Sequence, residues 1–298
     1  MRLMLRVTLG LALLLFFAVA HGSPVPAQPG QEMMPEQSVA KAKQVVQQVV
    51  NALGGTAFLY VHDTDCDGRV AQFGHNEELM GFTEFRDLWI LPDKNRTEYI
   101  AKGQNTITAF LMGADGLGIT HGGAMITVYN GNEGWQLDKS GVSDQPEDLI
   151  KNFNEEVKSG MNNMLRTRMN EAGVEVRYAG TDLIDLREAE WIEFTDREHR
   201  ELRLGVDKTS HLPLRWVVAT RDPDTRVRTE ISTSYTKYVS VDGVKMPMSI
   251  IRARNDQKIS QTFLSECKYN SSLEAQLFTR ASLEEVKKKG YQDPKGTK

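Results

Sequence analysis

The chain has 298 residues, of which 40% are hydrophobic and 26% are charged, and its formal net charge is −4. These values are ordinary for a globular protein and leave room for one large domain or two small ones. No long basic run occurs, so the sequence argues against nucleic acid as a partner.

The N-terminus predicts export. Two arginines precede the continuous apolar run VTLGLALLLFFAVA, whose last residues, Ala18 to Ala20, fit a cleavage site. This pattern is typical of a secretory signal peptide, over residues 1–20. An uncleaved anchor is the alternative, but the run is shorter than the roughly 20 residues that span a bilayer. Residues 21–37 predict a proline-rich disordered lead-in, and we expect a secreted chain, with the periplasm favoured.

The first predicted helix covers residues 38–53, because apolar side chains recur at helical spacing and two glycines follow. Strands are expected next, on both sides of the stretch HDTDCDG. That stretch carries alternating aspartates and then a glycine, at Asp63, Asp65, Asp67 and Gly68. An EF-hand calcium loop opens in this way, but it closes on a glutamate at position 12, where this chain has Gly74. The aspartates are therefore weak metal candidates, and a hairpin turn between two strands is the favoured interpretation.

A zinc site is a second possibility for the same region, using His62, Cys66 and His75. Histidine and cysteine suit zinc, but the spacing of these residues matches no known zinc motif. The sequence therefore predicts no metal. The two cysteines of the chain, Cys66 and Cys267, are instead candidates for a disulfide in an oxidising compartment. Sequence does not show whether their Cα atoms come within about 7 Å, so pairing and a free thiol both stay open.

A second helix is expected from Pro146 to just before Gly173, with an apolar stripe along one face. Nearly all of the remaining chain alternates apolar and polar residues between short, turn-like connections, which predicts an antiparallel meander. One face of this wide sheet is apolar and needs cover, which the two amphipathic helices can supply. We expect a curved sheet with a hydrophobic space between it and its helices. Such spaces commonly hold apolar ligands.

A serine acyl-enzyme is a further alternative, because SVAK, SDQ and KTS occur in the expected order. In such enzymes the third motif is Lys-Thr-Gly, but here it is KTS and lacks the glycine. The second motif, SDQ, ends in glutamine where those enzymes have asparagine. An antiparallel meander is also the wrong scaffold for this chemistry. Ser38 is better interpreted as a helix N-cap. We therefore predict no catalytic residue, no enzyme activity and no cofactor.

The order of elements resembles the outer-membrane lipoprotein carrier family, the LolA/LolB-like proteins. In LWILPDKNRTEYI, Pro92 and Arg96 match the family's strand, turn and strand unit, and in ITVYNGNEGWQLD, Gly131 and Trp135 match the following hairpin. The resemblance implies a mainly β fold with helices, an unclosed half β-barrel whose concave face is covered by a helical lid above a cavity for acyl chains. The carriers have a basic residue before the proline, where this chain has Leu91.

From this reading we expect one domain over residues 38–283, followed by a polar C-terminal tail over residues 284–298. The expected role is binding a lipid, an acyl chain or an acylated protein, as in envelope lipoprotein or lipid trafficking, by a monomer that can have envelope protein partners. The candidate cavity residues are Trp89, Leu91, Arg96, Trp135, Phe153, Met161, Trp191 and Trp216. The alternatives are an interaction domain with a filled core and no small ligand, and a hydrolase.

Overall fold

The computed structural model describes residues 33–100, 108–109, 117–118, 124–221 and 226–291. The chain divides into two compact units, Met1–Met34 and Pro35–Lys298, and every element named below belongs to the second. The expected signal peptide and most of the lead-in lie outside the described residues. Within the described ranges, no helix combines the length and the apolar character needed to cross a membrane.

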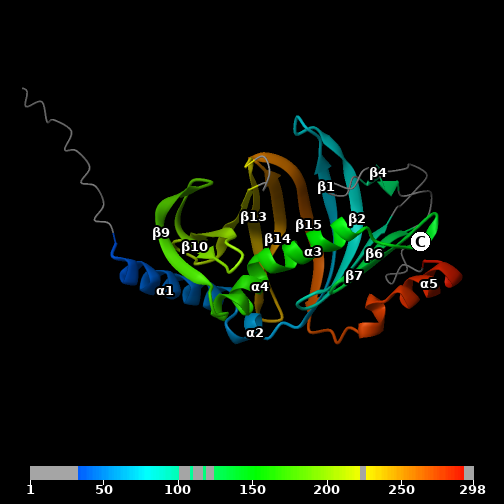
Figure 1. Cartoon of the computed structure of the whole chain (residues 1–298), viewed down its shortest axis with the longest axis horizontal. Coiled ribbons are helices and arrows are strands. Elements are labelled where there is room, and N and C mark those ends of the chain that lie inside the picture. Colours follow the sequence, from blue (N-terminus) through cyan, green and yellow to red (C-terminus); the bar gives the residue numbers. More distant parts are fainter. Residues whose placement is uncertain (1–32, 101–107, 110–116, 119–123, 222–225, 292–298) are drawn as a thin grey trace, which may run out of the picture. The chain divides into compact units, whose positions relative to one another are not determined.

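An antiparallel sheet of 13 strands dominates the second unit (Figure 1). In chain order its strands are β1 (Asp63–Phe73), β2 (Leu79–Ile90), β3 (Lys94–Ile100), β6 (Ala124–Asn130), β7 (Glu133–Asp138), β8 (Gly141–Asp144), β9 (Glu175–Ile184), β10 (Arg187–Thr195), β11 (Glu201–Asp207), β12 (Pro213–Arg221), β13 (Arg228–Val241), β14 (Val244–Arg254) and β15 (Gln257–Tyr269). Their spatial order is β8-β7-β6-β3-β2-β1-β15-β14-β13-β12-β11-β10-β9. Because β8 and β9 occupy the two ends of this order, the sheet is an open half-barrel, as the sequence predicted. Two further strands, β4 (Thr108–Ala109) and β5 (Leu117–Gly118), pair with each other in a separate two-stranded sheet.

Helices cover both faces of this sheet. They are α1 (Pro35–Leu53), α2 (Thr56–Leu59), α3 (Glu147–Ser159), α4 (Met161–Arg166) and α5 (Arg280–Lys289), with two 3-10 turns, η1 (Arg168–Asn170) and η2 (Ala275–Phe278). We call the face that carries α1, α3 and α4 the inner face and the face that carries η2 and α5 the outer face. In Figure 1, α3 and α4 run across the central strands and α5 lies near β7.

The two faces have separate apolar cores, because successive side chains of a strand point to opposite sides of the sheet. The inner core joins α1 and α4 to strands β10, β11 and β12. The outer core packs Leu88, Ile126 and Val128 of the sheet against Phe278 and Leu283, which belong to η2 and α5. The C-terminal helix thus continues past residue 283, where the tail was expected to begin, and Val286 also packs against this outer core.

The aspartate stretch is not a hairpin turn, contrary to the prediction, because residues 63–68 are part of the long strand β1. The residues of TAFL just before it form the short helix α2 instead of a strand. The turn prediction gave weight to three aspartates and a glycine, which are unfavourable in isolated strands. Here Asp63 accepts hydrogen bonds from the backbone of Ser271 and Ser272, and Asp65 pairs with Arg86 of β2. Partners far away in the sequence therefore satisfy these carboxylates within the sheet.

The second predicted helix is interrupted. Gly160 adopts an extended conformation and separates α3 from α4, so the expected single helix is two helices and a 3-10 turn. The N-cap interpretation of Ser38 is also wrong, because α1 begins three residues earlier. The Ser38 hydroxyl instead donates to the carbonyl of Tyr178 and accepts from its amide, which fastens α1 to the edge strand β9.

A disulfide joins Cys66 of β1 to Cys267 of β15, with 4.1 Å between the two Cα atoms. The two residues face each other directly in the antiparallel register. In the spatial order of the sheet, the β1–β15 pair connects β1, β2, β3, β6, β7 and β8 with the strands β9 to β15. The disulfide therefore staples the junction between the N-terminal and C-terminal halves of the sheet.

Candidate functional site

Helix α3 lies across the inner face but is only lightly packed. Among its residues, Phe153 alone is buried, whereas α1 buries six apolar side chains. Full burial of one large apolar side chain contributes about 1.5–3 kcal/mol. On this scale α1 is firmly anchored, and α3 is the helix of the inner face that separates from the sheet at the lowest cost.

Phe153 is wedged between two aromatic rings of the sheet. Its ring stacks on Tyr129 of β6 with 4.4 Å between the ring centroids, and on Trp89 of β2 with 5.7 Å. Trp89 and Tyr129 are aligned through Asn95 of β3, which lies between them in the register. The phenyl ring thus fills an aromatic slot, one ring wide, on the inner face.

The rest of α3 is held by polar contacts. Glu156 pairs with Arg252 of β14, and Glu155 pairs with Arg200, which follows β10. At the C-terminal end, the carbonyl of Ser159 accepts a hydrogen bond of 2.8 Å from the indole of Trp216 in β12. These contacts run from β2 and β6 to β12, so α3 bridges the sheet and covers the central strands between them.

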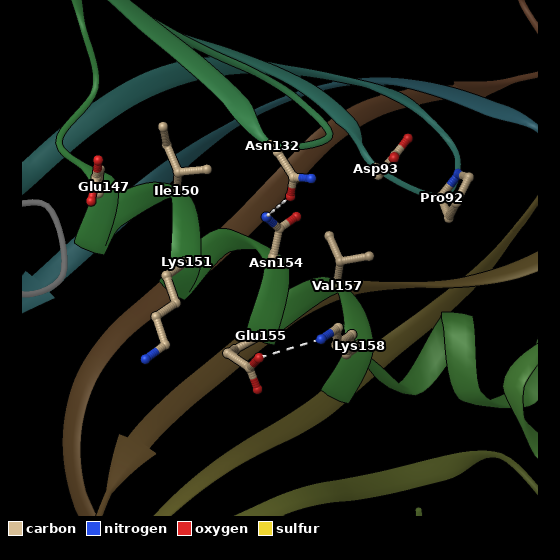
Figure 2. Close-up of a pocket in the computed structure, with 10 residues that line it drawn as sticks. All are labelled: Pro92, Asp93, Asn132, Glu147, Ile150, Lys151, Asn154, Glu155, Val157 and Lys158. Carbon is tan, nitrogen blue, oxygen red and sulfur yellow. Dashed lines mark hydrogen bonds and ion pairs between the residues drawn. The ribbon is translucent and has the colours of Figure 1, made fainter. Parts of the chain in front are cut away.

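The outward side of α3 borders an open groove of about 530 Å³ (Figure 2). Its lining is mostly polar and includes Pro92, Asp93, Asn132, Glu147, Ile150, Lys151, Asn154, Glu155, Val157 and Lys158. One hydrogen bond spans it, from the amide of Asn154 on α3 to Asn132 in the β6–β7 turn, at 3.0 Å. The groove marks the rim of α3, where the helix faces the β2–β3 and β6–β7 turns.

Beneath α3 the inner face carries tyrosines that lie deep in the fold. Burial raises the pKa of Tyr99 and of Tyr235 far above the usual value for a phenol, and the nearby charge of Asp87 raises that of Tyr99 further. Both residues nevertheless keep part of their surface accessible and are only half-buried. Burial likewise raises the pKa of Tyr129 and of Tyr269 to about 12. Parts of the Tyr99 and Tyr235 side chains on the inner face therefore stay accessible.

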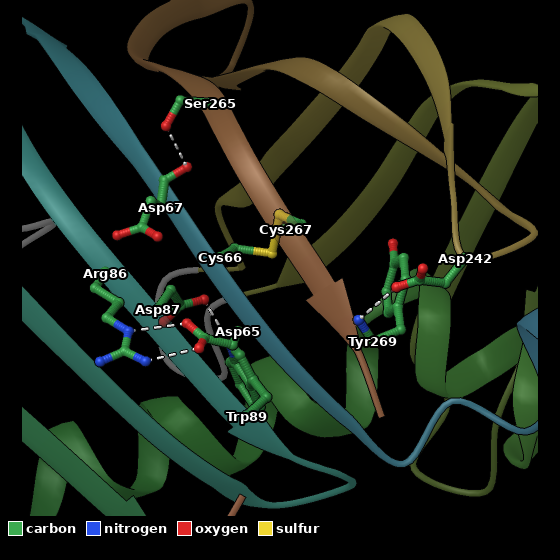
Figure 3. Close-up of a disulfide and its surroundings, with 10 residues drawn as sticks. All are labelled: Asp65, Cys66, Asp67, Arg86, Asp87, Trp89, Asp242, Ser265, Cys267 and Tyr269. Carbon is green, nitrogen blue, oxygen red and sulfur yellow. Dashed lines mark hydrogen bonds and ion pairs between the residues drawn. A yellow bond between two sulfur atoms is a disulfide. The ribbon is translucent and has the colours of Figure 1, made fainter. Parts of the chain in front are cut away.

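Asp87 of β2 lies on the same face, in phase with Phe85 and Trp89, and opposite Cys66 in the register (Figure 3). Its carboxylate accepts three hydrogen bonds, from the indole of Trp89 at 2.7 Å and from the side chains of Asn95 and Thr97 at 2.8 Å each. Burial raises the pKa of Asp87, although these three bonds act in the opposite direction. Among the described residues, no cation forms an ion pair with this carboxylate.

This burial predicts how the Asp87→Asn substitution changes the pH dependence of stability. Between the ordinary pKa of 3.8 and its raised value in the folded protein, the folded state keeps a proton that the unfolded state loses. The contribution of Asp87 to the free energy of unfolding is therefore greatest below pH 4 and falls as the pH rises through this window. Urea unfolding of the wild type and the Asp87→Asn variant from pH 3.5 to 8 measures this contribution. The free energy of unfolding of the wild type minus that of the variant should fall with pH, and a difference that stays flat or rises contradicts the prediction.

The predicted cavity residues do not all lie at one place. Trp89 and Phe153 meet in the aromatic slot. Three others, Leu91, Met161 and Trp216, belong to the inner core or pack against it. Contrary to the prediction, Trp191 points away from the inner face, because its neighbour Ile192 occupies the inner core and the strand alternates.

Arg96 and Trp135 also lie away from the inner face, in the row that contains Leu88 and Val128 of the outer core. The guanidinium of Arg96 is buried and forms an ion pair with Glu98 at 2.6 Å. It also donates to the carbonyl of Leu277, at 3.1 Å, in the η2 turn. The Arg96 carried over from the family resemblance thus fastens the C-terminal segment to the outer face.

The sequence reasoning missed Asp87, Tyr99, Tyr129 and Tyr235. A signal for Asp87 was present in the sequence, because an acidic residue between Phe85 and Trp89 at alternate positions of a strand shares their face. The tyrosines gave no such signal, because only the register of the sheet brings them together.

The weak metal candidates were Asp63, Asp65 and Asp67. In the described segments, no three His, Cys, Asp or Glu side chains form a group that could hold a metal ion.

No family model matches the chain, and no curated protein has a significantly similar sequence. Among solved structures, a domain from Vibrio parahaemolyticus described as an outer membrane lipoprotein-sorting protein is similar, with 12% identity, a TM-score of 0.49, and coverage of 83% of this chain and 99% of that one. A DUF1329 family protein from Desulfovibrio piger has 12% identity and a TM-score of 0.48, over 81% and 98% of the two chains. A LolA superfamily protein from Nitrosomonas europaea has 13% identity and a TM-score of 0.47, over 81% and 99%.

Proposed function

We propose that this chain is an exported binding protein that holds a lipid, an acyl chain or an acylated protein on the inner face of its sheet, beneath α3. The observation that carries the proposal is the single phenylalanine anchor of α3, seated in an aromatic slot on a face whose tyrosines are only half-buried. In this role α3 is a lid, and Phe153 occupies the slot while no ligand is bound. The work that such a protein performs is transfer or storage in the cell envelope, without a chemical reaction.

The free energy of burying a ligand can offset the cost of moving Phe153 out of the slot. Undocking Phe153 costs up to about 3 kcal/mol of apolar burial, and each buried methylene of a ligand returns about 0.8 kcal/mol. About four methylenes therefore offset the loss of the phenylalanine, and a longer acyl chain gives a net gain. The Cys66–Cys267 disulfide supports the proposed export, because structural disulfides are rare in the cytoplasm.

Cross-linking α3 to the sheet is expected to block ligand uptake. In the variant with Asn132→Cys and Asn154→Cys, a short bis-maleimide should join α3 to the β6–β7 turn, whereas the native cysteines, already paired, do not react. Uptake of a fluorescent fatty acid should fall at least tenfold after cross-linking. The matched control is the same variant treated with a mono-maleimide, which should bind as the wild type does. Equal uptake by the two samples contradicts the lid.

Mass spectrometry of organic extracts from the natively purified protein identifies the ligand class directly. We expect lipid or acylated material to be present in stoichiometric amount. The second candidate function, an interaction domain without a small ligand, rests on the well-filled inner core around α1 and α4. An empty and stable protein that also fails to bind added fatty acid favours that second function.

A further inference from the structure

The carboxylate of Asp87 has no ion-pair partner among the described residues, and it lies beside the aromatic ring of Trp89. Its Oδ1 atom accepts from both Asn95 and Thr97, whereas Oδ2, among the residues that the structure describes, accepts only from Trp89. A carboxylate has about four acceptor positions, two on each oxygen, so Oδ2 retains one. The remaining position is available to a donor that approaches from the inner face, on which Asp87 is only half-buried.

The surroundings of this oxygen favour a cation. Trp89 and Tyr129 flank the slot that Phe153 fills, and Asn95, which bonds to Asp87, lies between them in the register. Aromatic faces attract ammonium groups, and a carboxylate shielded from water adds a charge-assisted hydrogen bond. The charge that acts on Asp87 is that of Asp65, which is paired with Arg86. Elsewhere on the inner face, Glu156 of α3 and Arg252 of β14 are paired with each other. The carboxylate of Asp87 can therefore pair with a cationic group of a ligand.

We propose that Asp87, Trp89 and Tyr129 form a subsite for a primary ammonium group carried by the apolar ligand, which enters when Phe153 leaves the slot. This subsite rests on the proposed function, because it assigns the head group of a ligand whose tail lies beneath α3. An N–H donor is required in order to use the remaining acceptor position of Oδ2. A quaternary ammonium, which has no N–H, fits the rings but not this acceptor.

Three probes with the same tail test the assignment: dodecylammonium, dodecyltrimethylammonium and dodecanol. Isothermal titration should give the tightest binding for dodecylammonium and the weakest for dodecanol, with the two cationic probes kept below their micellar concentrations and dodecanol below its solubility limit. In the Asp87→Asn variant, affinity for dodecylammonium should fall about 10- to 100-fold, the loss expected for one charge-assisted hydrogen bond. Affinity for dodecanol should stay within about twofold, because dodecanol carries no charge for Asp87 to bind.

Asp144→Asn is the matched control, because it removes one negative charge from an exposed side chain on the edge strand β8. It should leave all three affinities unchanged. If the wild type binds dodecanol as tightly as dodecylammonium, the subsite is refuted while the proposed function stands, and this comparison requires no variant to fold. If none of the three probes binds, the proposed function fails and the subsite fails with it.

Discussion

Replacing Cys66 and Cys267 together by alanine is expected to lower the free energy of unfolding by about 4 kcal/mol, at the upper end of the range for a single disulfide. The bond closes a loop with a sequence separation of 201 residues, so its loss restores much conformational freedom to the unfolded chain. It also removes the covalent link at the β1–β15 junction, the pairing that joins the two halves of the sheet. Urea unfolding followed by tryptophan fluorescence measures the change.

The control for this variant lies on the same two strands. Val70 and Thr262 are also opposite each other in the β1–β15 register, and replacing both by alanine removes a cross-strand contact but no covalent bond. This control should cost no more than about 1 kcal/mol. Equal destabilisation by the two double variants would mean that local packing, and not the covalent link, stabilises the junction.

Replacing Phe153 by alanine is expected to release α3 from the sheet. A buried phenylalanine contributes about 3–5 kcal/mol relative to alanine, and α3 has no second buried side chain to keep it docked. Amide exchange in α3 should accelerate about 100-fold or more. Exchange in α1, which buries six apolar residues, should change little. Association of a fluorescent fatty acid should become faster, because the aromatic slot is vacant.

Ile150→Ala provides the matched control on the same helix. Ile150 is half-buried and lines the open groove on the rim of α3, and it takes no part in the ring stacking of Phe153 with Trp89 and Tyr129. Its substitution should leave the exchange of α3 and the association rate close to those of the wild type. If the Phe153 variant instead loses stability throughout the fold without faster association, α3 is a structural element of one cooperative unit and not a lid.

Sequence periodicity was sufficient to predict the sheet and its helical cover. Alternation in the strands after Gly173 predicted a meander, and the stripe in residues 38–53 predicted the helix that now anchors the inner core. The stretch around Asp63 was misassigned because its partners, Ser271 and Arg86, are distant in the sequence or on a neighbouring strand. Local propensity carries no information about such partners.

The candidate site was harder to predict, because it depends on register. A one-residue shift moves every side chain of a strand to the other face, so the sequence did not show which tryptophans share the inner face. Trp89 faces inward, whereas Trp135 and Trp191 do not. The position of Asp87 between Phe85 and Trp89 was readable from the alternation, but its hydrogen-bond partners Thr97, directly opposite it on β3, and Asn95, two residues along, follow only from the register.

Photo-labelling with a diazirine-bearing fatty acid, followed by mapping of the labelled peptides, tests the central claim most directly. The two apolar regions of the molecule serve as each other's controls. Binding beneath α3 predicts labels on the inner face, at peptides that contain Tyr99, Tyr235 and Leu264, with little labelling of the outer core. Labels concentrated instead at Phe278 and Leu283 under α5, or spread equally over both faces, would contradict the account.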